Sequence, residues 1–156
     1  MSGFLIRGLD PAPFAPLFGL SDAALAEHGA RRMVATAKPG SPCRVTLEDA
    51  EPGESLILAN FEHLPVDSPY RSRHAVFVRE GAREPAEYRD AIPVQFRSRT
   101  LSLRAFDEAG MMVEADLVEG EAIEPIIDRM FADPAVAYLH AHFARPGCFA
   151  GRIDRA

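Results

Sequence analysis

The sequence contains no tryptophan, a single lysine (Lys38) and only two cysteines, Cys43 and Cys148. Two cysteines cannot supply the disulfide framework of a small secreted domain, so we expect both to be reduced thiols. No apolar run approaches the roughly 18 residues that a membrane-spanning helix requires. The N-terminal stretch MSGFLIRGLDPAPF also lacks the basic region and the long apolar run of a signal peptide. These absences predict a cytoplasmic protein that has no membrane partner.

The chain also lacks an excess of positive charge, because its formal net charge is −6 at pH 7. Non-specific nucleic-acid binding needs a basic surface that releases counterions, so no nucleic-acid partner is expected. The cationic residues are nearly all arginine, whose planar guanidinium holds carboxylates and phosphates in a fork. With 156 residues, 47% of them hydrophobic, the chain can bury a core, and we expect one globular domain over residues 1–156.

Short apolar segments separated by proline and glycine predict a fold made mostly of strands. Strands are expected over residues 3–9, 30–38, 54–63, 74–80 and 92–98, with a polar turn or short helix over 84–91. Ser21 is a typical cap for a short helix that Gly29 would end. An amphipathic helix is predicted by the spacing of Ile123, Ile126, Ile127, Met130 and Phe131. The predicted fold class is α+β: a mainly antiparallel sheet with one long C-terminal amphipathic helix and a short N-terminal helical region.

A β-hairpin is predicted over residues 99–119. The apolar face of its first strand holds residues 101, 103 and 105, and that of its second strand holds residues 111, 113, 115 and 117. Joining the two apolar faces places Ala105 opposite Val113 and Arg104 opposite Glu114. This register leaves a tight loop in which Gly110 takes a positive φ.

Four short motifs carry a resemblance to a known family. They are Pro42-Cys43-Arg44, Pro52-Gly53-Glu54, Ser68-Pro69-Tyr70-Arg71 and Gly147-Cys148. Through them nearly the whole chain resembles an uncharacterised bacterial family, domain of unknown function 1203. The resemblance implies no established activity, so every role considered for a residue rests on its own chemistry.

The segment YLHAHFARPGC, from Tyr138 to Cys148, places two histidines one residue apart and a cysteine after a Pro-Gly turn. In a strand, His140 and His142 share one face, and the opposite face carries apolar core residues. Histidines at this spacing can chelate a metal ion, but zinc sites draw three or four ligands, and no third ligand stands at a diagnostic spacing. We therefore expect an ordinary strand face whose histidines point outward or into a groove, with neither a metal nor a cofactor.

Cys43 and Arg44 lie in a loop rich in proline and glycine. A neighbouring guanidinium can lower the pKa of a thiol and make it a nucleophile that uses a histidine as its base. The candidate bases are His74, His140 and His142. In the competing interpretation, Cys43 is a small buried residue that packs its loop against the core. A disulfide to Cys148 is a third alternative, disfavoured in a reducing cytosol.

Two Arg-Ser-Arg triplets place Arg71 with Arg73, and Arg97 with Arg99, on common strand faces. Arg97 and Arg99 would continue the core face of the predicted hairpin, where a guanidinium needs a carboxylate or a bound anion. Glu119, opposite Arg99 in the predicted register, and Glu121 are the protein carboxylates that would satisfy this need.

Three hypotheses for function follow from these residues. The leading one is a non-enzymatic module whose arginine-lined rim binds a small anion or an acidic segment of a partner protein. The second is an enzyme that uses Cys43 as its nucleophile, assisted by Arg44 and a histidine such as His74. The third is a structural homodimer that forms through an exposed strand edge and binds no ligand.

Overall fold

The structure is a computed structural model that describes residues 3–156, and the chain divides into two compact units. Unit 1 consists of residues 3–7, Glu62–His74 and Glu87–Ala156, and unit 2 consists of Gly8–Phe61 and Ala75–Ala86. Two strands, β3 (Ser55–Leu64) and β4 (Ser72–Arg79), contribute residues to both units. The single domain that the chain length suggests stays a prediction.

The secondary structure is mostly antiparallel sheet, so the predicted α+β class with one long C-terminal helix is wrong. The described residues form nine strands in two sheets, and helices account for 16% of the chain. The helix in question, α3 (Ile123–Phe131), has nine residues and is followed by two strands. Its five apolar positions span only those nine residues, so the pattern that predicts a helix also limits its length. Within residues 3–156, no helix combines the length and the apolar character needed to cross a membrane.

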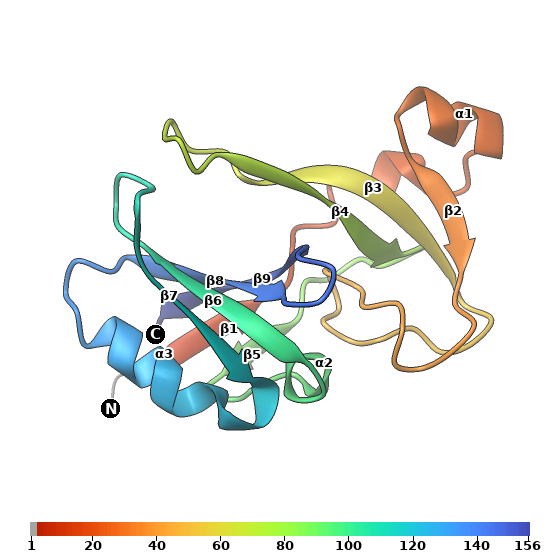
Figure 1. The fold of residues 1–156 in the computed structure, drawn as a ribbon. Helices are drawn as coiled ribbons and strands as arrows, with labels where there is room; N and C mark the ends of the chain where they lie inside the picture. Colours follow the sequence, from red (N-terminus) through yellow and green to blue (C-terminus); the bar gives the residue numbers. More distant parts are fainter. Residues whose placement is uncertain (1–2) are drawn as a thin grey trace. The chain divides into compact units, whose positions relative to one another are not determined.

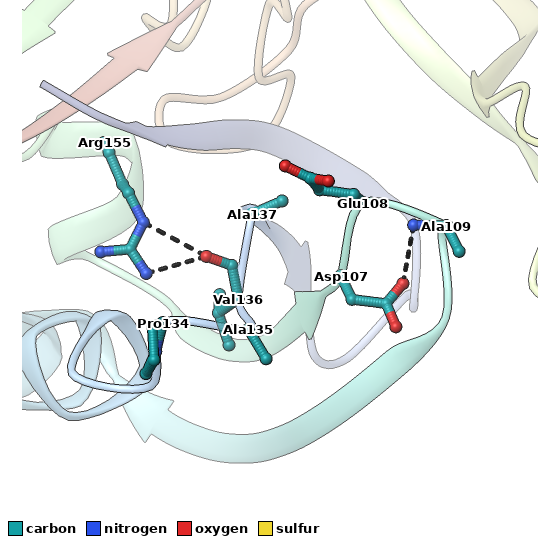
Figure 2. Close-up of a pocket in the computed structure, with 8 residues that line it drawn as sticks. All are labelled: Asp107, Glu108, Ala109, Pro134, Ala135, Val136, Ala137 and Arg155. Atoms are coloured by element: carbon teal, nitrogen blue, oxygen red, sulfur yellow. Dashed lines mark hydrogen bonds between the residues drawn. The ribbon is translucent and has the colours of Figure 1, made fainter.

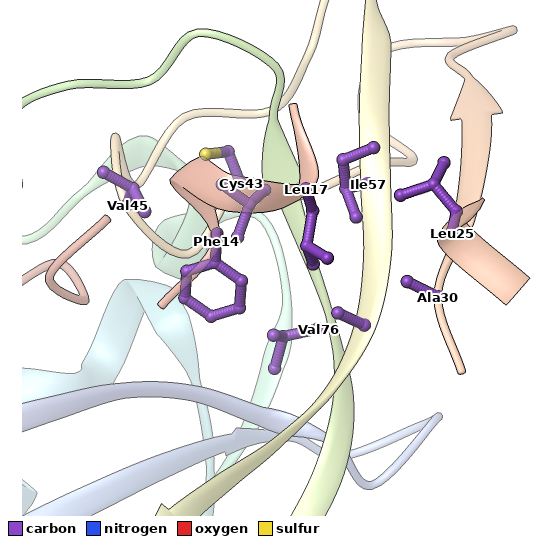
Figure 3. Close-up of a cluster of buried hydrophobic side chains, with 10 residues drawn as sticks. Phe14, Leu17, Leu25, Ala30, Cys43, Val45, Ile57 and Val76 are labelled. Atoms are coloured by element: carbon purple, nitrogen blue, oxygen red, sulfur yellow. The ribbon is translucent and has the colours of Figure 1, made fainter. Parts of the chain in front are cut away.

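Unit 2 is built on a three-stranded sheet with strand order β2-β3-β4. Its other elements are η1 (Ala15–Leu17), α1 (Asp22–Glu27) and the edge strand β2 (Arg31–Val34). Ser21 caps α1 as predicted, because its Oγ accepts a hydrogen bond from the backbone N of Ala24 at 3.1 Å, and Gly29 follows with a φ of 69°. The core of unit 2 includes Phe14, Leu17, Leu25, Cys43, Val45, Ile57 and Val76 (Figure 3).

Unit 1 is built on a six-stranded antiparallel sheet with strand order β5-β1-β9-β8-β6-β7 (Figure 1). The strands are β1 (Phe4–Arg7), β5 (Glu87–Arg89), β6 (Thr100–Phe106), β7 (Met112–Glu119), β8 (Tyr138–Phe143) and β9 (Phe149–Arg155). The remaining elements are the helices α2 (Val94–Arg97), η2 (Gly120–Ala122) and α3. β8 and β9 lie in the centre of the sheet, between strands that come earlier in the chain.

Two short segments of unit 1 differ from what their sequence predicts. Residues 92–98, expected as a strand, contain helix α2, with Pro93 at its N-cap and Phe96 fully buried. Proline suits the start of a helix because the N–H that it lacks has no partner there. Residues 84–91, expected as a polar turn or short helix, contain β5, which pairs with β1 at the sheet edge. The partner strand is distant in the sequence, so local composition does not reveal it.

The hairpin of β6 and β7 forms as predicted, but the predicted register is wrong by one residue. Ala105 stands opposite Glu114, and Arg104 stands opposite Ala115 rather than Glu114. An irregularity then follows between Ala105 and Phe106. A shift of one residue turns each side chain of β7 to the other face of the sheet.

This register brings β7 into contact with α3, which lies along one face of the sheet (Figure 1). Arg129 of α3 pairs with Glu114 at an N–O distance of 2.5 Å and with Asp116 at 2.8 Å. Both acids therefore face the helix, and Val113 and Leu117 are exposed on the opposite side. The observed register thus gives Glu114 and Asp116 an ion-pair partner on the helix that follows β7, and the alternation within the hairpin contains no sign of that partner.

The turn at Asp107–Met111 is correctly predicted, with Gly110 at a φ of 77°. A Cβ atom on Gly110 would lie 2.6 Å from Cγ2 of Val66. We expect Gly110→Val to lower the free energy of unfolding by about 2 kcal/mol or more, because a β-branched residue is strained at positive φ and also meets Val66. Urea unfolding measures the loss.

The matched control is Gly53→Val, because Gly53 also has a positive φ, 92°, but a Cβ atom on Gly53 would meet no atom within 4 Å. The control should lose less stability than Gly110→Val. Equal losses in the two variants would mean that Val66 contributes nothing to the requirement for glycine.

Candidate functional site

Four of the five histidines in the chain lie together in unit 1. His140 and His142 project from β8 on the face of the sheet opposite to α3, because side chains alternate along a strand. His63, near the end of β3, and His74, near the start of β4, belong to the segment 62–74 of the same unit. The ring centroids of His63 and His142 are 5.1 Å apart, and those of His63 and His140 are 5.6 Å apart.

Three of these histidines are close enough to share one ion. One ring nitrogen from each of His63, His140 and His142 lies within 4.8 Å of the other two. A tetrahedral zinc ion with bonds of about 2.0–2.1 Å holds its nitrogens about 3.3 Å apart, so the widest pair would close by up to about 1.5 Å. Small rotations of the imidazole rings provide such a movement, because the torsion that turns a ring is soft.

The hydrogen bonds of the rings indicate which nitrogens carry protons. Nδ1 of His142 lies 3.0 Å from the carbonyl oxygen of Gly147, which can only accept, so Nδ1 is protonated and Nε2 keeps its lone pair. Nε2 of His63 lies 2.7 Å from Nδ1 of His74. If His63 donates this bond, its Nδ1 keeps a lone pair, whereas the reverse would bury an N–H without an acceptor, which is rarer in proteins.

Two nitrogens of the cluster are buried without satisfying their hydrogen-bonding capacity. They are Nδ1 of His63 and Nδ1 of His140, which have no hydrogen-bond partner within residues 3–156. The two residues are 8% and 1% exposed. A buried polar atom without a partner costs on the order of 1–3 kcal/mol, so its retention in a core points to a use that the protein alone does not fulfil.

Burial keeps the three histidines neutral at physiological pH. Desolvation, reinforced by the charges of His74 and Arg104, lowers the pKa of His63 from 6.5 to about 4. Desolvation is also the main cause that lowers the pKa of His142 to about 3 and that of His140 to about 2. A neutral imidazole is the form that binds a metal ion, so no proton has to be removed first.

The walls of the cluster are aromatic. The ring of Phe149 stacks on His63 with centroids 4.8 Å apart and meets His140 at 4.9 Å. Phe106 contacts His140 edge-on at 5.4 Å. These rings offer no competing hydrogen bonds, and they lower the local dielectric, which strengthens any electrostatic interaction inside the cluster.

Arg104 of β6 adjoins the cluster. Its Nη1 lies 3.5 Å from Nε2 of His142, and its Nε donates to Oγ of Ser102 at 3.3 Å. The side chain is half-buried, and desolvation lowers the pKa of its guanidinium. In the described part of the chain no carboxylate pairs with Arg104, whereas Arg97 of the same unit pairs with Glu124.

Cys43 and Arg44, the residues proposed for thiol chemistry, are both buried and hydrogen-bonded to the backbone. Cys43 is fully buried in the core of unit 2, where its Sγ accepts hydrogen bonds from the backbone N of Arg79 at 3.3 Å and of Thr46 at 3.5 Å. Arg44 is also buried and donates to the carbonyl oxygen of its neighbour Pro42 at 2.6 Å. His74, the proposed base, belongs to unit 1 and pairs with another histidine. Within residues 3–156, neither Cys43 nor Cys148 forms a disulfide, and the catalytic role of Cys43 stays a hypothesis.

The arginines of the first triplet share one acidic neighbour. Arg71 donates to Glu62 at 2.9 Å, and Nη1 of Arg73 lies 3.7 Å from the same carboxylate. Glu62 thus provides within unit 1 the negative charge that a bound anion was expected to provide. These contacts support internal ion pairing, and anion binding at this place stays a hypothesis.

The arginines of the second triplet do not continue the core face of β6, because the strand begins at Thr100. Arg97 lies in α2, pairs with Glu124 and donates to the carbonyl oxygen of Gly120 at 3.1 Å. Arg99 donates to the carbonyl oxygen of Gln95 at 3.0 Å and stacks over the ring of Phe143 at 4.9 Å. Glu119, expected opposite Arg99, stands opposite Thr100. Arg97 and Arg99 therefore do not share a strand face.

A surface depression of unit 1 is a weaker candidate (Figure 2). It is lined by Asp107, Glu108, Ala109, Pro134, Ala135, Val136, Ala137 and Arg155. The guanidinium of Arg155 donates to the carbonyl oxygens of Val136 and Phe131. A carboxylate oxygen of Asp107 accepts hydrogen bonds from two backbone N–H groups. These groups already hold the polypeptide together, so few are free to recognise a ligand.

Sequence reasoning named His74, His140 and His142 as candidate residues and missed His63. His63 lies on another strand, far upstream of His140, and no spacing rule connects positions that tertiary folding alone brings together. The one local signal is that His63 and His74, eleven residues apart, lie on two strands joined by the Ser68-Pro69 turn segment. A hairpin interpretation of that segment places the two histidines near each other, although it does not connect them to β8.

Comparison with known proteins identifies a family but no individual protein that matches. The family model described as "Protein of unknown function (DUF1203)" matches residues 40–155. No curated protein and no solved structure matches the chain.

Proposed function

Because the chain belongs to this family of unknown function, its role has to be derived from its own geometry, and we propose that unit 1 binds one divalent transition-metal ion through His63, His140 and His142. The observation that carries the proposal is the convergence of three buried ring nitrogens within 4.8 Å. Two further features support it: buried Nδ1 atoms without partners, and pKa values far below the physiological range.

The donor set favours an ion of the Zn²⁺ class. Imidazole nitrogens suit zinc, copper, nickel and iron, whereas magnesium and calcium require oxygen ligands. Three protein ligands leave a fourth tetrahedral position open to water or another ligand, which distinguishes catalytic zinc sites from structural ones. The bond from Nδ1 of His142 to the carbonyl oxygen of Gly147 is the kind of outer contact that orients a ligating histidine.

Metal loading tests the proposal directly. Untagged protein is stripped with EDTA, incubated with Co²⁺, passed through a desalting column and analysed for metal by mass spectrometry. We expect one equivalent of cobalt and the intense visible absorption of a four-coordinate ion. His63→Phe should lose both signals, because it keeps an aromatic ring against Phe149 and removes the ligand nitrogen.

The chain offers a matched control in His28, an exposed histidine of unit 2 that lies outside the cluster. His28→Ala should retain one equivalent of cobalt. Cobalt that stays bound to His63→Phe would place the ion elsewhere, and wild-type protein that binds no cobalt would contradict the proposal.

The other hypotheses have less support from geometry. Internal carboxylates pair with Arg71, Arg73 and Arg97, which weakens anion binding at an arginine rim. Homodimerisation has one favourable observation, the exposed apolar side chains of Val113 and Leu117 on the edge strand β7. Neither hypothesis accounts for the buried histidines, so metal binding is preferred.

A further inference from the structure

The charge balance of the proposed metal site is incomplete. Its three ligands are neutral histidines, so they offset none of the two positive charges that a divalent ion brings. Arg104 adds a third positive charge, and among residues 3–156 it has no carboxylate partner. Burying positive charge without a compensating anion is costly, so a site of this composition favours a negatively charged ligand.

The position of Arg104 directs its donors toward the same place. Arg104 stands opposite His140 in the pairing of β6 with β8, on the face that carries both histidines of β8. Its Nη1 lies 3.5 Å from Nε2 of His142, the nitrogen that retains a lone pair. An ion that takes this lone pair displaces the guanidinium from its weak hydrogen bond and leaves its N–H groups beside the open coordination position.

We infer that Arg104 and the bound metal together form a site for a small oxyanion, such as a carboxylate or phosphate. One oxygen of the anion occupies the open position of the metal, and a second oxygen accepts hydrogen bonds from the Arg104 guanidinium. The planar fork of arginine suits this geometry, because two parallel N–H groups can meet two oxygens of one anion. The inference rests on the proposed metal function and adds the chemical class of the ligand.

The neighbouring arginine on the same sheet provides a contrast. Arg152 of β9 stands opposite His140 on its other side, but its Nε donates to Asp154 at 2.8 Å and its guanidinium lies over the ring of Tyr138. Arg152 therefore has its own carboxylate. Arg104 and Arg152 flank the same histidine. Of the two, only Arg104 has no carboxylate partner within residues 3–156.

The visible spectrum of the cobalt-loaded protein tests the inference. Wild-type protein is titrated with oxalate in one arm and phosphate in the other, with chloride at equal ionic strength as the reference. We expect saturable spectral changes at millimolar oxyanion. Arg104→Met should bind cobalt at least as tightly as wild type, because a repelling charge is removed, yet require at least tenfold more oxyanion for half-saturation. Arg152→Met should behave like wild type.

Each outcome decides between the two claims. Absence of cobalt from wild-type protein overturns the metal function and this inference together. Cobalt binding with equal oxyanion affinities in wild type and Arg104→Met overturns the inference and leaves the metal function intact. If Arg104→Met does not fold, Arg104→Lys replaces it. Lys keeps the charge but loses the planar fork, and an unchanged affinity for both anions in that variant would overturn the role assigned to the guanidinium.

Discussion

Adding Zn²⁺ to EDTA-treated protein is expected to raise its melting temperature by about 10 °C. A ligand that binds only the folded state stabilises it by RT ln(1 + [L]/Kd), about 4 kcal/mol at a thousandfold excess over Kd. For a chain of this length each kcal/mol corresponds to roughly 2–4 °C. Only the folded state brings the ligands together, because His63 lies on β3 while His140 and His142 lie on β8. Melting followed by circular dichroism, in buffer free of phosphate, measures the shift.

His140→Phe is the most informative variant for this experiment. It removes a ligand nitrogen, so the variant should show no shift with Zn²⁺. It also removes a buried Nδ1 that has no partner, so the metal-free variant should be at least as stable as metal-free wild type. His28→Ala should shift as much as wild type. A Zn²⁺ shift in His140→Phe that equals the wild-type shift would show that the stabilisation comes from another place on the protein.

Metal-free protein is expected to lose about 4 kcal/mol of stability between pH 7.5 and pH 5.5. The folded-state pKa values of His63, His142 and His140 are about 4, 3 and 2, against 6.5 for an ordinary histidine. Below pH 6.5 these histidines therefore bind protons in the unfolded chain but not in the folded chain, so stability falls as the pH falls. Each group loses about 1.4 kcal/mol at one pH unit below its unfolded pKa. The loss continues down to the folded pKa values.

Urea midpoints measured in EDTA at constant ionic strength test this expectation. His28→Ala should follow the wild-type curve, and His140→Phe should lose about one third less stability over the same interval. The ion-paired carboxyls of Glu54 and Glu80 do not interfere, because their pKa values are lowered from 4.5 to about 2 and their contribution is lost only below pH 4.5. Stability that stays constant from pH 7.5 to pH 5.5 would mean that the histidines are already protonated or solvated in the folded state.

Local chemistry sufficed to predict several elements of the fold. The Ser21 cap, the end of α1 at Gly29 and the turn at Gly110 depend on interactions between residues close in the sequence, and all three are found. The apolar spacing of α3 likewise predicts a helix that exists, although the helix is short.

The errors have a common physical cause in contacts between distant residues. In the observed register two acids of β7 pair with Arg129 of a later helix, and the strand β5 pairs with β1 at the start of the chain. The histidine cluster is the same kind of feature. A strand with His140 and His142 on one face can be predicted from their spacing, but whether that face is wet or buried depends on His63 and the rest of segment 62–74.

The central position of β8 and β9 has a consequence for how the protein matures during synthesis. The strands β1 and β5 on one side and β6 and β7 on the other are joined only through this hairpin. A ribosome releases His63 and His74 well before His140 and His142, so a nascent chain that stops short of Tyr138 holds two separate strand pairs and only one of the three proposed metal ligands. Because long-range strand pairing is slow and is completed late, the growing chain should be unable to capture the ion in advance. Metal loading would then report that the whole of unit 1 has been made and folded.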